Sequence, residues 1–365
     1  SQIQIKKPLT RYFRPMEPST NTSWKNPPIN SLSGWHTSNS LLSRNPHKPL
    51  LNRAIMGQYP PGSTFKTTQA LTFLQEGIVT PQTLFPCSMG FRFKGLTVGC
   101  HAHGAPIPLV PSLATSCNSY YCWGLFQMFS NRKKYATVQD AMTRWKDYMV
   151  SMGFGYALGV DLPGEKRGMI PNAPYYDKAY RGSWNGLTVI SISIGQGEVN
   201  ATPLQIANLG ATIANRGWFI TPHVVKDIQD EELDTLYTTR RYTMAERSNY
   251  EYVVQGMRQA VLAGTCHAAN SPHYEVCGKT GTAQNPHGQD HSAFMGFAPM
   301  NDPKIAICVY VENGIWGATF GVPIGSLMME QYLTGGLSPE SEEKAKTFEE
   351  RHLISVDNGF GKQER

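Results

Sequence analysis

Hydrophobic and polar positions follow a regular period only after about residue 50. Residues 1–50 are polar and irregular, with Pro, Asn and Ser throughout, so no helix or strand is predicted there. The turn residues Tyr59-Pro-Pro-Gly62 then precede Ser63, which stands where a helix N-cap or first-turn residue lies, and a helix is expected over 64–74. We therefore expect an irregular lead-in at 1–45, the remnant of a preceding region, and a folded domain from residue 46.

The later elements are predicted from hydrophobic period and capping residues. Helices are expected over 110–123, 138–152, 202–216, 250–263 and 323–333. Strands are expected over 91–98, 276–283, 293–298 and 305–312, the last three as an antiparallel meander. This order does not alternate strand and helix, which argues against a doubly wound parallel sheet and favours a mixed α/β (α+β) domain. The folded domain is expected to end at residue 337, and the charged residues after it predict a polar, mobile tail at 338–365.

Composition restricts the function classes. Hydrophobic residues make up 40% of the 365 and charged residues 16%, as in a globular chain. The net charge of +6 is spread out, and no Lys/Arg run with interleaved aromatics supports nucleic-acid binding. No apolar run reaches 18 residues, and the chain begins without Met or a signal core, so we expect an excised or processed piece.

The first candidate for chemistry is Ser63-Thr-Phe-Lys66. On a helix this spacing places the hydroxyl and the amine on one face, within reach of a hydrogen bond. A serine hydroxyl is a weak nucleophile until a base removes its proton, and a desolvated lysine can be that base. The S-x-x-K pattern alone occurs often by chance, so it needs further support.

Two later motifs supply that support. Ser116-Cys-Asn118 offers a second hydroxyl and an amide about fifty residues on, and Lys279-Thr-Gly281 with Thr282 lies on the first strand of the meander. These three motifs in this order are typical of penicillin-binding proteins and class A β-lactamases.

The wider sequence resembles the class B penicillin-binding proteins, and among them the cell-elongation transpeptidases of the penicillin-binding protein 2 type. The resemblance covers about residues 46–337 and is carried by three segments: Tyr59–Lys66, Ser193-Ile-Gly-Gln-Gly197 with Ala201-Thr-Pro-Leu-Gln205, and Gly278–Ala283. It implies a penicillin-binding protein/serine β-lactamase-like fold, in which helices flank an antiparallel sheet beside an all-helical subdomain. The family's strands, pedestal domain and membrane helix before the catalytic helix are not recognisable in 1–45.

The resemblance also implies roles for the motif residues. Ser63 would attack a stem peptide ending in D-Ala-D-Ala, Lys66 would take its proton, and Ser116 and Asn118 would complete the proton path. The substrate carboxylate and backbone would be held by the third motif, Lys279, Thr280, Gly281 and Thr282. The oxyanion hole would consist of the backbone N–H groups of Ser63 and Thr282. A second stem peptide would then form the cross-link, and β-lactams would acylate Ser63.

Cysteines and histidines gather between the first two motifs: Cys87, Cys100, His101, His103 and Cys117. Three thiolates and one imidazole would make a closed tetrahedral zinc site. The resemblance implies such a site with Cys87, Cys100, His103 and Cys117 as ligands. A Cys87–Cys100 disulfide and unlinked thiols remain the alternatives.

A D,D-transpeptidase of cell-wall elongation and cell shape is the function implied. The alternatives are a serine β-lactamase and a non-catalytic β-lactam sensor. Cys117 replaces the aspartate of class A β-lactamases, and no glutamate is evident to activate a deacylating water, which favours a slowly deacylating β-lactam target. The resemblance further implies a polytopic glycan polymerase as partner. It implies a location at the periplasmic face of the bacterial inner membrane, with the anchor on an N-terminal segment absent from this chain.

Overall fold

The computed structural model describes residues 48–286 and 288–351. The chain divides into two units, 1–52 and 53–365, and the site and its supports lie in the second. The lead-in predicted at 1–45 falls outside the described residues. Within the described ranges, no helix is both long and apolar enough to cross a bilayer.

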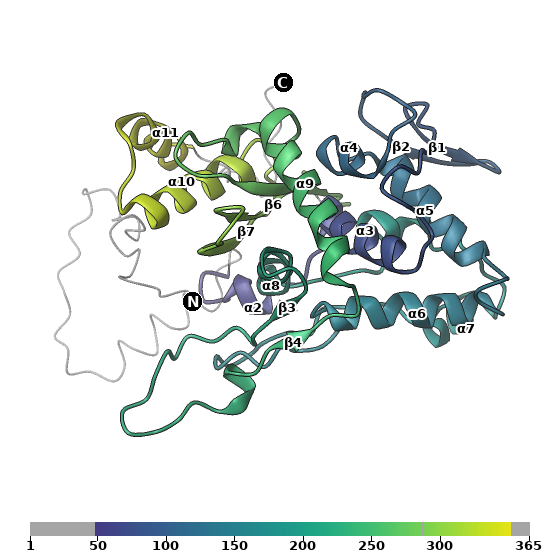
Figure 1. Ribbon diagram of the computed structural model, residues 1–365, viewed down its shortest axis with the longest axis horizontal. Coiled ribbons are helices and arrows are strands. Elements are labelled where there is room, and N and C mark those ends of the chain that lie inside the picture. The colour runs from purple at the N-terminus through teal and green to yellow at the C-terminus, as the bar shows by residue number, and fades with distance from the viewer. Residues whose placement is uncertain (1–47, 287, 352–365) are drawn as a thin grey trace. The chain divides into compact units, whose positions relative to one another are not determined.

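The elements of the second unit are shown in Figure 1. The helices are α2 (Arg53–Met56), the 3-10 helix η1 (Gly62–Phe65), α3 (Lys66–Gln75), α4 (Leu109–Ala114), α5 (Asn118–Ser130), α6 (Val138–Ser151), α7 (Ala173–Tyr180), η2 (Ile190–Ile194), α8 (Pro203–Ala214), η3 (Thr235–Tyr237), α9 (Arg247–Ala263), η4 (His267–Ala269), α10 (Gly321–Thr334) and α11 (Pro339–Glu349). The strands are β1 (Gly90–Phe93), β2 (Leu96–Gly99), β3 (Trp218–Phe219), β4 (Arg241–Tyr242), β5 (Cys277–Ala283), β6 (His291–Ala298) and β7 (Ile305–Val311).

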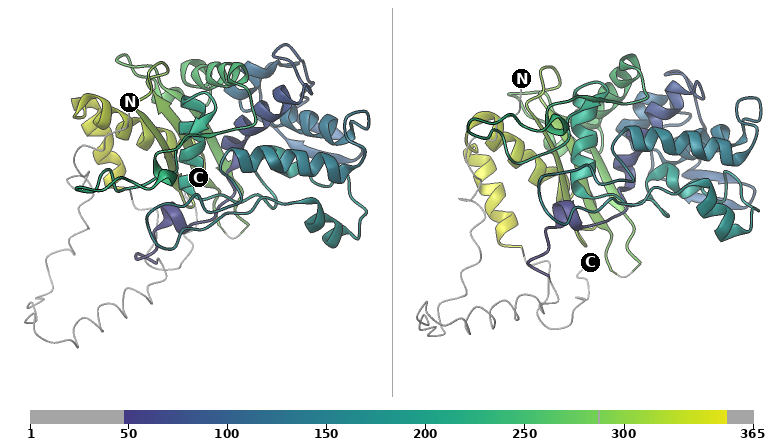
Figure 2. Two further views of the ribbon diagram at one scale, coloured as in Figure 1. Left: turned by 60° about the horizontal axis from the view of Figure 1, so that its bottom comes forward. Right: turned by 90° about the horizontal axis from the view of Figure 1, so that it is seen from below.

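A three-stranded antiparallel sheet in the order β5-β6-β7 supports the site. Successive residues of a strand point to opposite faces, and neighbouring residues of β6 meet different helices. A Cβ on Gly325 of α10 would lie 2.5 Å from the ring of Phe294, and one on Gly210 of α8 would lie 3.3 Å from Met295. The sheet is therefore covered by α10 on one face and by α8 on the other (Figure 2). Among the residues that the structure describes, β5 pairs only with β6, so its other edge is unpaired there and can accept a ligand.

Helix α3 lies at the centre of the helical part and is buried over most of its length. It packs against α5, α6 and α9. Its Gln69 accepts a hydrogen bond of 2.9 Å from the indole of buried Trp145 on α6. The helix that follows the predicted nucleophile is thus a core element, and its position is fixed from several sides.

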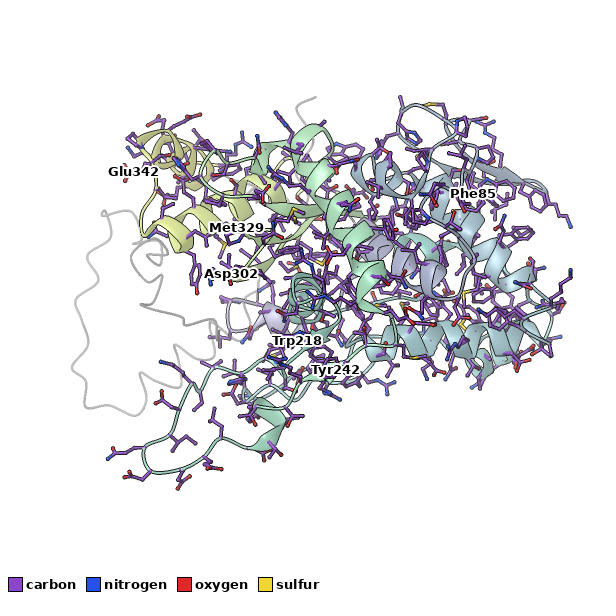
Figure 3. All side chains as sticks on the ribbon, in the orientation of Figure 1. Phe85, Trp218, Tyr242, Asp302, Met329 and Glu342 are labelled. Carbon is purple, nitrogen blue, oxygen red and sulfur yellow. The ribbon has the colours of Figure 1, made fainter. Side chains whose placement is uncertain are left out.

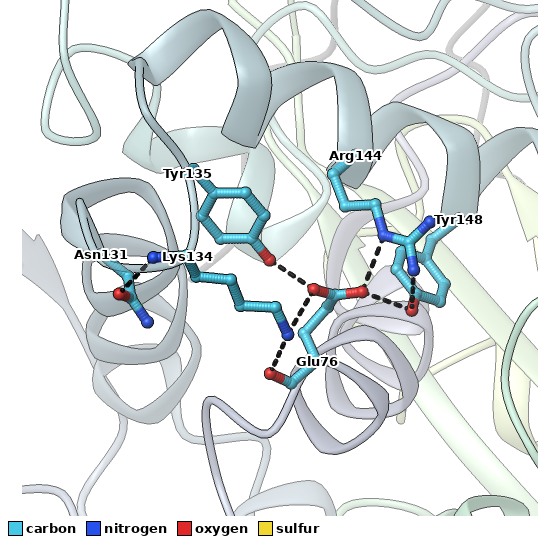
Figure 4. A network of polar contacts seen from close by, with 6 residues as sticks. All are labelled: Glu76, Asn131, Lys134, Tyr135, Arg144 and Tyr148. Atoms are coloured by element: carbon cyan, nitrogen blue, oxygen red, sulfur yellow. Dashed lines mark hydrogen bonds and ion pairs between the residues drawn. The ribbon is translucent and has the colours of Figure 1, made fainter.

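The carboxylate of Glu76 fixes the C-terminal end of α3 (Figure 4). One oxygen accepts hydrogen bonds from Arg144 (2.8 Å) and Tyr148 (2.6 Å), both on α6. The other accepts from Tyr135 (2.5 Å) and pairs with Lys134 (2.7 Å). Burial on its own would raise the pKa of Glu76, but these four donors outweigh it and lower the pKa to about 2.

Small hairpins complete the unit. Trp218 of β3 lies opposite Tyr242 of β4 (Figure 3). The strand predicted over 91–98 is instead the hairpin β1–β2, because Lys94 and Gly95 at its centre both take positive φ values, 47° and 82°, and reverse the chain. The single-strand prediction was therefore wrong.

The helix predicted over 110–123 was also wrong, since two helices, α4 and α5, occupy this range. Ser116 has a φ of 58°, the left-handed conformation that ends a helix. Cys117 then begins α5 as its N-cap, and its Sγ accepts the N–H of Tyr120 at 3.4 Å. Because the helix is interrupted here, the Ser116 side chain lies in a position that it would not occupy in a continuous helix.

The tail predicted at 338–365 is wrong for residues 339–349, which form α11. Ser338 caps this helix by accepting the N–H of Ser341, Pro339 follows at the first helical position, and acidic residues occupy the first turn. Glu330 of α10 anchors it by accepting the Ser338 N–H at 2.8 Å and the Ser341 hydroxyl at 2.5 Å. Residues 352–365 lie outside the described part.

The other predicted elements are confirmed to within a few residues. The meander predicted over 276–312 corresponds to β5, β6 and β7, and the helices predicted from 138, 250 and 323 correspond to α6, α9 and α10. The helix expected to open at Thr202 is α8, with Thr202 and Gln205 forming a reciprocal capping box.

Candidate active site

A cleft of about 290 Å3 runs along the open edge of β5. Its lining comes from every predicted motif: Ser63 from η1, Ser116 and Asn118 from the α4–α5 break, and Thr280 and Thr282 from β5. Lys66 and Lys279 lie behind this lining and are completely buried. The structure therefore brings together residues that are more than 200 positions apart in sequence.

Lys66 occupies the centre of the hydrogen-bond network. Its Nζ donates to the carbonyl oxygen of Ser116 (2.6 Å), to Ser116 Oγ (3.1 Å) and to Asn118 Oδ1 (2.6 Å). Burial lowers the pKa of Lys66 to about 8, so its neutral form is accessible near neutral pH. No hydrogen bond joins it to Ser63 Oγ in the described part, and such bonds often form only when a substrate is bound.

Lys279 reaches the same hydroxyl from the sheet side. Its Nζ donates to Ser116 Oγ at 2.9 Å and to the Thr280 carbonyl at 3.1 Å. Burial first, and the charge of Lys66 second, lower the pKa of Lys279 to about 7. Ser116 Oγ thus bridges two lysines, and one lysine of the pair is neutral slightly above neutral pH.

The Ser116–Asn118 loop is held from outside the cleft. Asn118 donates its side-chain N–H to the Gly99 carbonyl at 2.7 Å, while its backbone N–H donates to Cys100 Sγ at 3.2 Å. Ser116 has a left-handed backbone conformation, which is roughly 1 kcal/mol higher in energy for a residue with a side chain. The loop therefore depends on the contacts of Asn118 with Gly99 and Cys100.

Ser63 is placed by close backbone packing. Gly62 has a φ of 55°, and a Cβ there would lie 2.7 Å from the Thr282 carbonyl oxygen. Gly62 N–H also donates to Gly195 at 3.0 Å. The Thr282 carbonyl accepts from Gln196 at 3.2 Å, on the cleft side of β5. In an antiparallel strand a residue's N–H and C=O point the same way, so the Thr282 N–H faces the cleft as well.

The predicted cysteine–histidine cluster also lies together. The ligand atoms of Cys87, Cys100, His103 and Cys117 are all within 4.8 Å of one another. None of the seven cysteines forms a disulfide. His103 directs Nε2 to Cys100 Sγ (3.4 Å), and its Nδ1 contacts the Gly104 carbonyl (2.8 Å), as a metal-ligating histidine does.

His101 lies outside this cluster. Its ring contacts the exposed Trp316, with centroids 5.6 Å apart, and both line the cleft.

Sequence reasoning missed several lining residues. Thr265 accepts the hydroxyl of Thr280 at 2.7 Å, and Gln196, Asp290 and Trp316 complete the walls. Gln196 lies inside a segment quoted for the resemblance, which could have identified it. No signal in the sequence distinguishes the other three.

The fold and the cleft define a class of protein in which two serines line a cleft beside an unpaired strand edge and two buried lysines contact the second serine. The family described as the penicillin-binding protein transpeptidase domain matches residues 18–326. The chain belongs to this family.

Two relatives are about a third identical to the chain over the aligned residues. Peptidoglycan D,D-transpeptidase MrdA of Acinetobacter baumannii is 33% identical over 308 residues, 78% of this chain and 44% of the relative. Peptidoglycan D,D-transpeptidase PbpA of Mycolicibacterium smegmatis is 30% identical, over 81% of the chain and 59% of the relative. The chain spans about half the length of the first curated relatives it matches.

Solved structures of transpeptidases are also similar to this chain. A crystal structure of Pseudomonas aeruginosa PBP2 in complex with WCK 5153 superposes with a TM-score of 0.72, at 29% identity over 83% of this chain and 66% of that one. A chain from a peptidoglycan synthase complex gives 0.70, at 29% over 83% and 51%. PBP2 of Helicobacter pylori in complex with MreC gives 0.66, at 25% over 84% and 54%. These likenesses establish the mixed α/β transpeptidase fold.

Proposed function

We propose that the chain is the catalytic domain of a peptidoglycan D,D-transpeptidase of cell-wall elongation, which cross-links stem peptides through a Ser63 ester. The observation that carries this proposal is the network in which Ser116 Oγ bridges Lys66 and Lys279 behind Ser63. The three residues are buried and come from separate parts of the chain: α3, the break between α4 and α5, and β5. Packing alone does not require that these polar groups meet.

In the first step, Ser63 Oγ attacks the carbonyl carbon of the penultimate D-alanine. The serine proton passes to Lys66 in its neutral form, and the negative oxygen is stabilised by the N–H groups of Ser63 and Thr282. The C–N bond breaks as the network returns a proton to the leaving D-alanine. The amine of a second stem peptide then attacks the ester, forms the cross-link and releases Ser63.

The substrate lies along the open edge of β5. An extended peptide adds to such an edge by backbone hydrogen bonds, and its terminal carboxylate meets the hydroxyl groups and charge of Lys279, Thr280 and Thr282. Gly281 lets the segment before Ser63 lie close to β5, because a Cβ at this position would lie 3.0 Å from the Pro61 carbonyl oxygen. A β-lactam enters by the same route.

Labelling with a fluorescent penicillin tests this function. Native protein should retain a covalent label on a denaturing gel, and Ser63→Ala should retain none. Ser183→Ala is the matched control, because Ser183 lies exposed in a turn after α7. A label that persists in Ser63→Ala would refute the assignment. Rapid loss of the label with penicillin hydrolysis would indicate a β-lactamase, and stable label without transfer of a D-Ala-D-Ala donor to an amine acceptor would indicate a sensor.

We further propose that Cys87, Cys100, His103 and Cys117 hold a structural zinc ion. Three sulfurs and one imidazole nitrogen within 4.8 Å fit a tetrahedral Cys3His set, and His103 has the tautomer-fixing partner such ligands use. When bound, zinc would cross-link the hairpin, its following loop and the α5 N-terminus. Cys117 lies between Ser116 and Asn118, so the cluster would support the catalytic loop.

Metal analysis tests the zinc site. Purified native protein should contain about one zinc, and Cys117→Ser should lose it together with thermal stability. Cys308→Ala, which removes a thiol on β7 outside the cluster, should keep the metal. Less than half an equivalent in the native protein would refute the proposal.

For the whole protein, we propose action at the periplasmic face of the bacterial inner membrane with a glycan polymerase as partner. The relatives solved with MreC and within a peptidoglycan synthase complex support this assignment. The full-length protein should co-purify with a polytopic membrane polymerase. Failure to co-purify would contradict the proposed partnership.

A further inference from the structure

Two loops meet at the end of the cleft away from the lysines. The turn between β5 and β6 ends at Asp290, and the segment after β7 carries Trp316. The N–H of Ile315 donates to the Asp290 carbonyl at 2.7 Å, so the two loops are linked at this point. Both Asp290 and Trp316 line the cleft that contains Ser63.

The backbone of Trp316 is fixed while its side chain is half exposed. Its carbonyl accepts the Ser292 hydroxyl at 2.7 Å. The next residue, Gly317, has no room for a side chain, since a Cβ would lie 2.7 Å from the carbonyl oxygens of Ala293 and Gly281. Trp316 as a whole is 50% exposed, and its one ring contact among the described residues is with His101. A large aromatic held in this way offers a face to a ligand.

Charge is distributed unevenly along the cleft. Asp290 is the one carboxylate in the lining, and no lysine or arginine of the described residues lines it. The Oδ1 atom of Asp290 accepts the N–H of Asn285 at 3.2 Å, whereas Oδ2 has no partner within the described ranges. Buried Lys279 pairs with Met295 on β6, whereas Ala283 pairs with His291 beside Asp290, so Lys279 lies at the other end of β5 from Asp290. The cleft thus has a cationic end for a carboxylate and an anionic end at Asp290.

We propose that Asp290 and Trp316 form a subsite for a primary ammonium group on the side chain of the acyl donor. The carboxylate supplies an ion pair and the indole a cation–π contact. The proposal rests on the transpeptidase function and adds two residues, Asp290 and Trp316, that would recognise a side-chain amine on the donor peptide or on a β-lactam.

The direction of the bound chain agrees with this placement. A donor that lies antiparallel to β5 with its carboxylate at Thr280 extends, toward its own N-terminus, past Thr282 and Gln284. Gln284 opens the turn that ends at Asp290. The side chains that precede D-Ala-D-Ala therefore reach the anionic end of the cleft.

The test uses two penicillins that differ by one α-amino group, ampicillin and benzylpenicillin. The second-order rates at which each acylates Ser63 are measured, and the ratio of ampicillin to benzylpenicillin is compared between proteins. Asp290→Asn keeps an oxygen for the Asn285 N–H and loses the charge, so this ratio should fall about fivefold. Trp316→Leu should lower it about twofold. Asp302→Asn, in the exposed turn after β6, is the control and should keep the native ratio.

The native protein gives a second measurement that needs no variant. Raising the ionic strength screens a half-exposed ion pair, so the native ratio should fall with salt. An equal ratio in native protein and Asp290→Asn, or a native ratio that does not change with salt, would overturn the subsite while leaving the proposed function intact. If neither penicillin labels Ser63, both the function and the subsite are refuted.

Discussion

Replacing Glu76 by glutamine should destabilise the domain, because this carboxylate anchors the end of the helix that follows Ser63. Its side chain is only 3% exposed and accepts from four donors. In Glu76→Gln one oxygen becomes an NH2 group that faces two of these donors. The pKa falls from 4.5 to about 2 in the folded protein, which corresponds to about 3 kcal/mol of stability at neutral pH.

The sign of the pH dependence follows from the lowered pKa. The contribution is complete above the unfolded value of 4.5 and is lost as the pH falls toward 2. At pH 7 the free energy of unfolding in urea should be about 3 kcal/mol lower for the variant than for the native protein. This difference should shrink between pH 4.5 and 2. With roughly 300 residues unfolding, this corresponds to a melting temperature about 5 °C lower.

Tryptophan fluorescence during urea titration measures this difference. Glu232→Gln is the matched control, since the same charge is removed from an exposed loop, and it should change stability by less than about 0.5 kcal/mol. A Glu76→Gln protein as stable as the native one at pH 7, or a deficit that persists unchanged at pH 2.5, would refute the reasoning.

Three further predictions concern the cleft. Acylation of Ser63 by penicillin should accelerate with pH up to about 8, because burial lowers the pKa of Lys66 to about 8 and only a neutral amine can accept a proton; a rate independent of pH from 6 to 9 would contradict this. Ser116→Ala removes the bridging hydroxyl and should slow acylation by about 100-fold with little change in melting temperature. Gly195→Ala should reduce both labelling and stability, since its Cβ would lie 2.2 Å from the Gly62 carbonyl oxygen; a variant with native labelling would show that this contact is not needed.

The sequence predicted which motif residues lie together better than it predicted the backbone around them. The Ser63/Lys66 motif and the third motif are each short, local patterns. Each could be found in the sequence without knowledge of where the other motif lies in the fold. The break at Ser116 could not be found in the same way, because 110–123 has helical periodicity throughout. The helix ends there because Ser116 takes a left-handed conformation that contacts with Lys66 and the Cys100 sulfur support.

The helix over 339–349 was missed for a related reason. Its charged sequence has no apolar face to indicate burial, and its anchor, Glu330, lies on another helix. Local composition therefore predicted a tail, whereas capping and the contact with α10 produce a helix.

The resemblance to a known family selected the cysteines and the histidine that lie together. By itself, the sequence determined the order of most of the main elements and the predicted nucleophile with its lysine. These are properties of local spacing, which a chain carries before it folds. Only the tertiary structure decided that one hydroxyl joins both lysines, that β5 has an unpaired edge among the described residues, and that Asp290 and Trp316 line the same cleft as Ser63. The contacts of Ser116 Oγ with the two lysines, at 3.1 and 2.9 Å, join distant segments of the chain. Burial, which lowers the pKa of both lysines, exists only once the layers have packed.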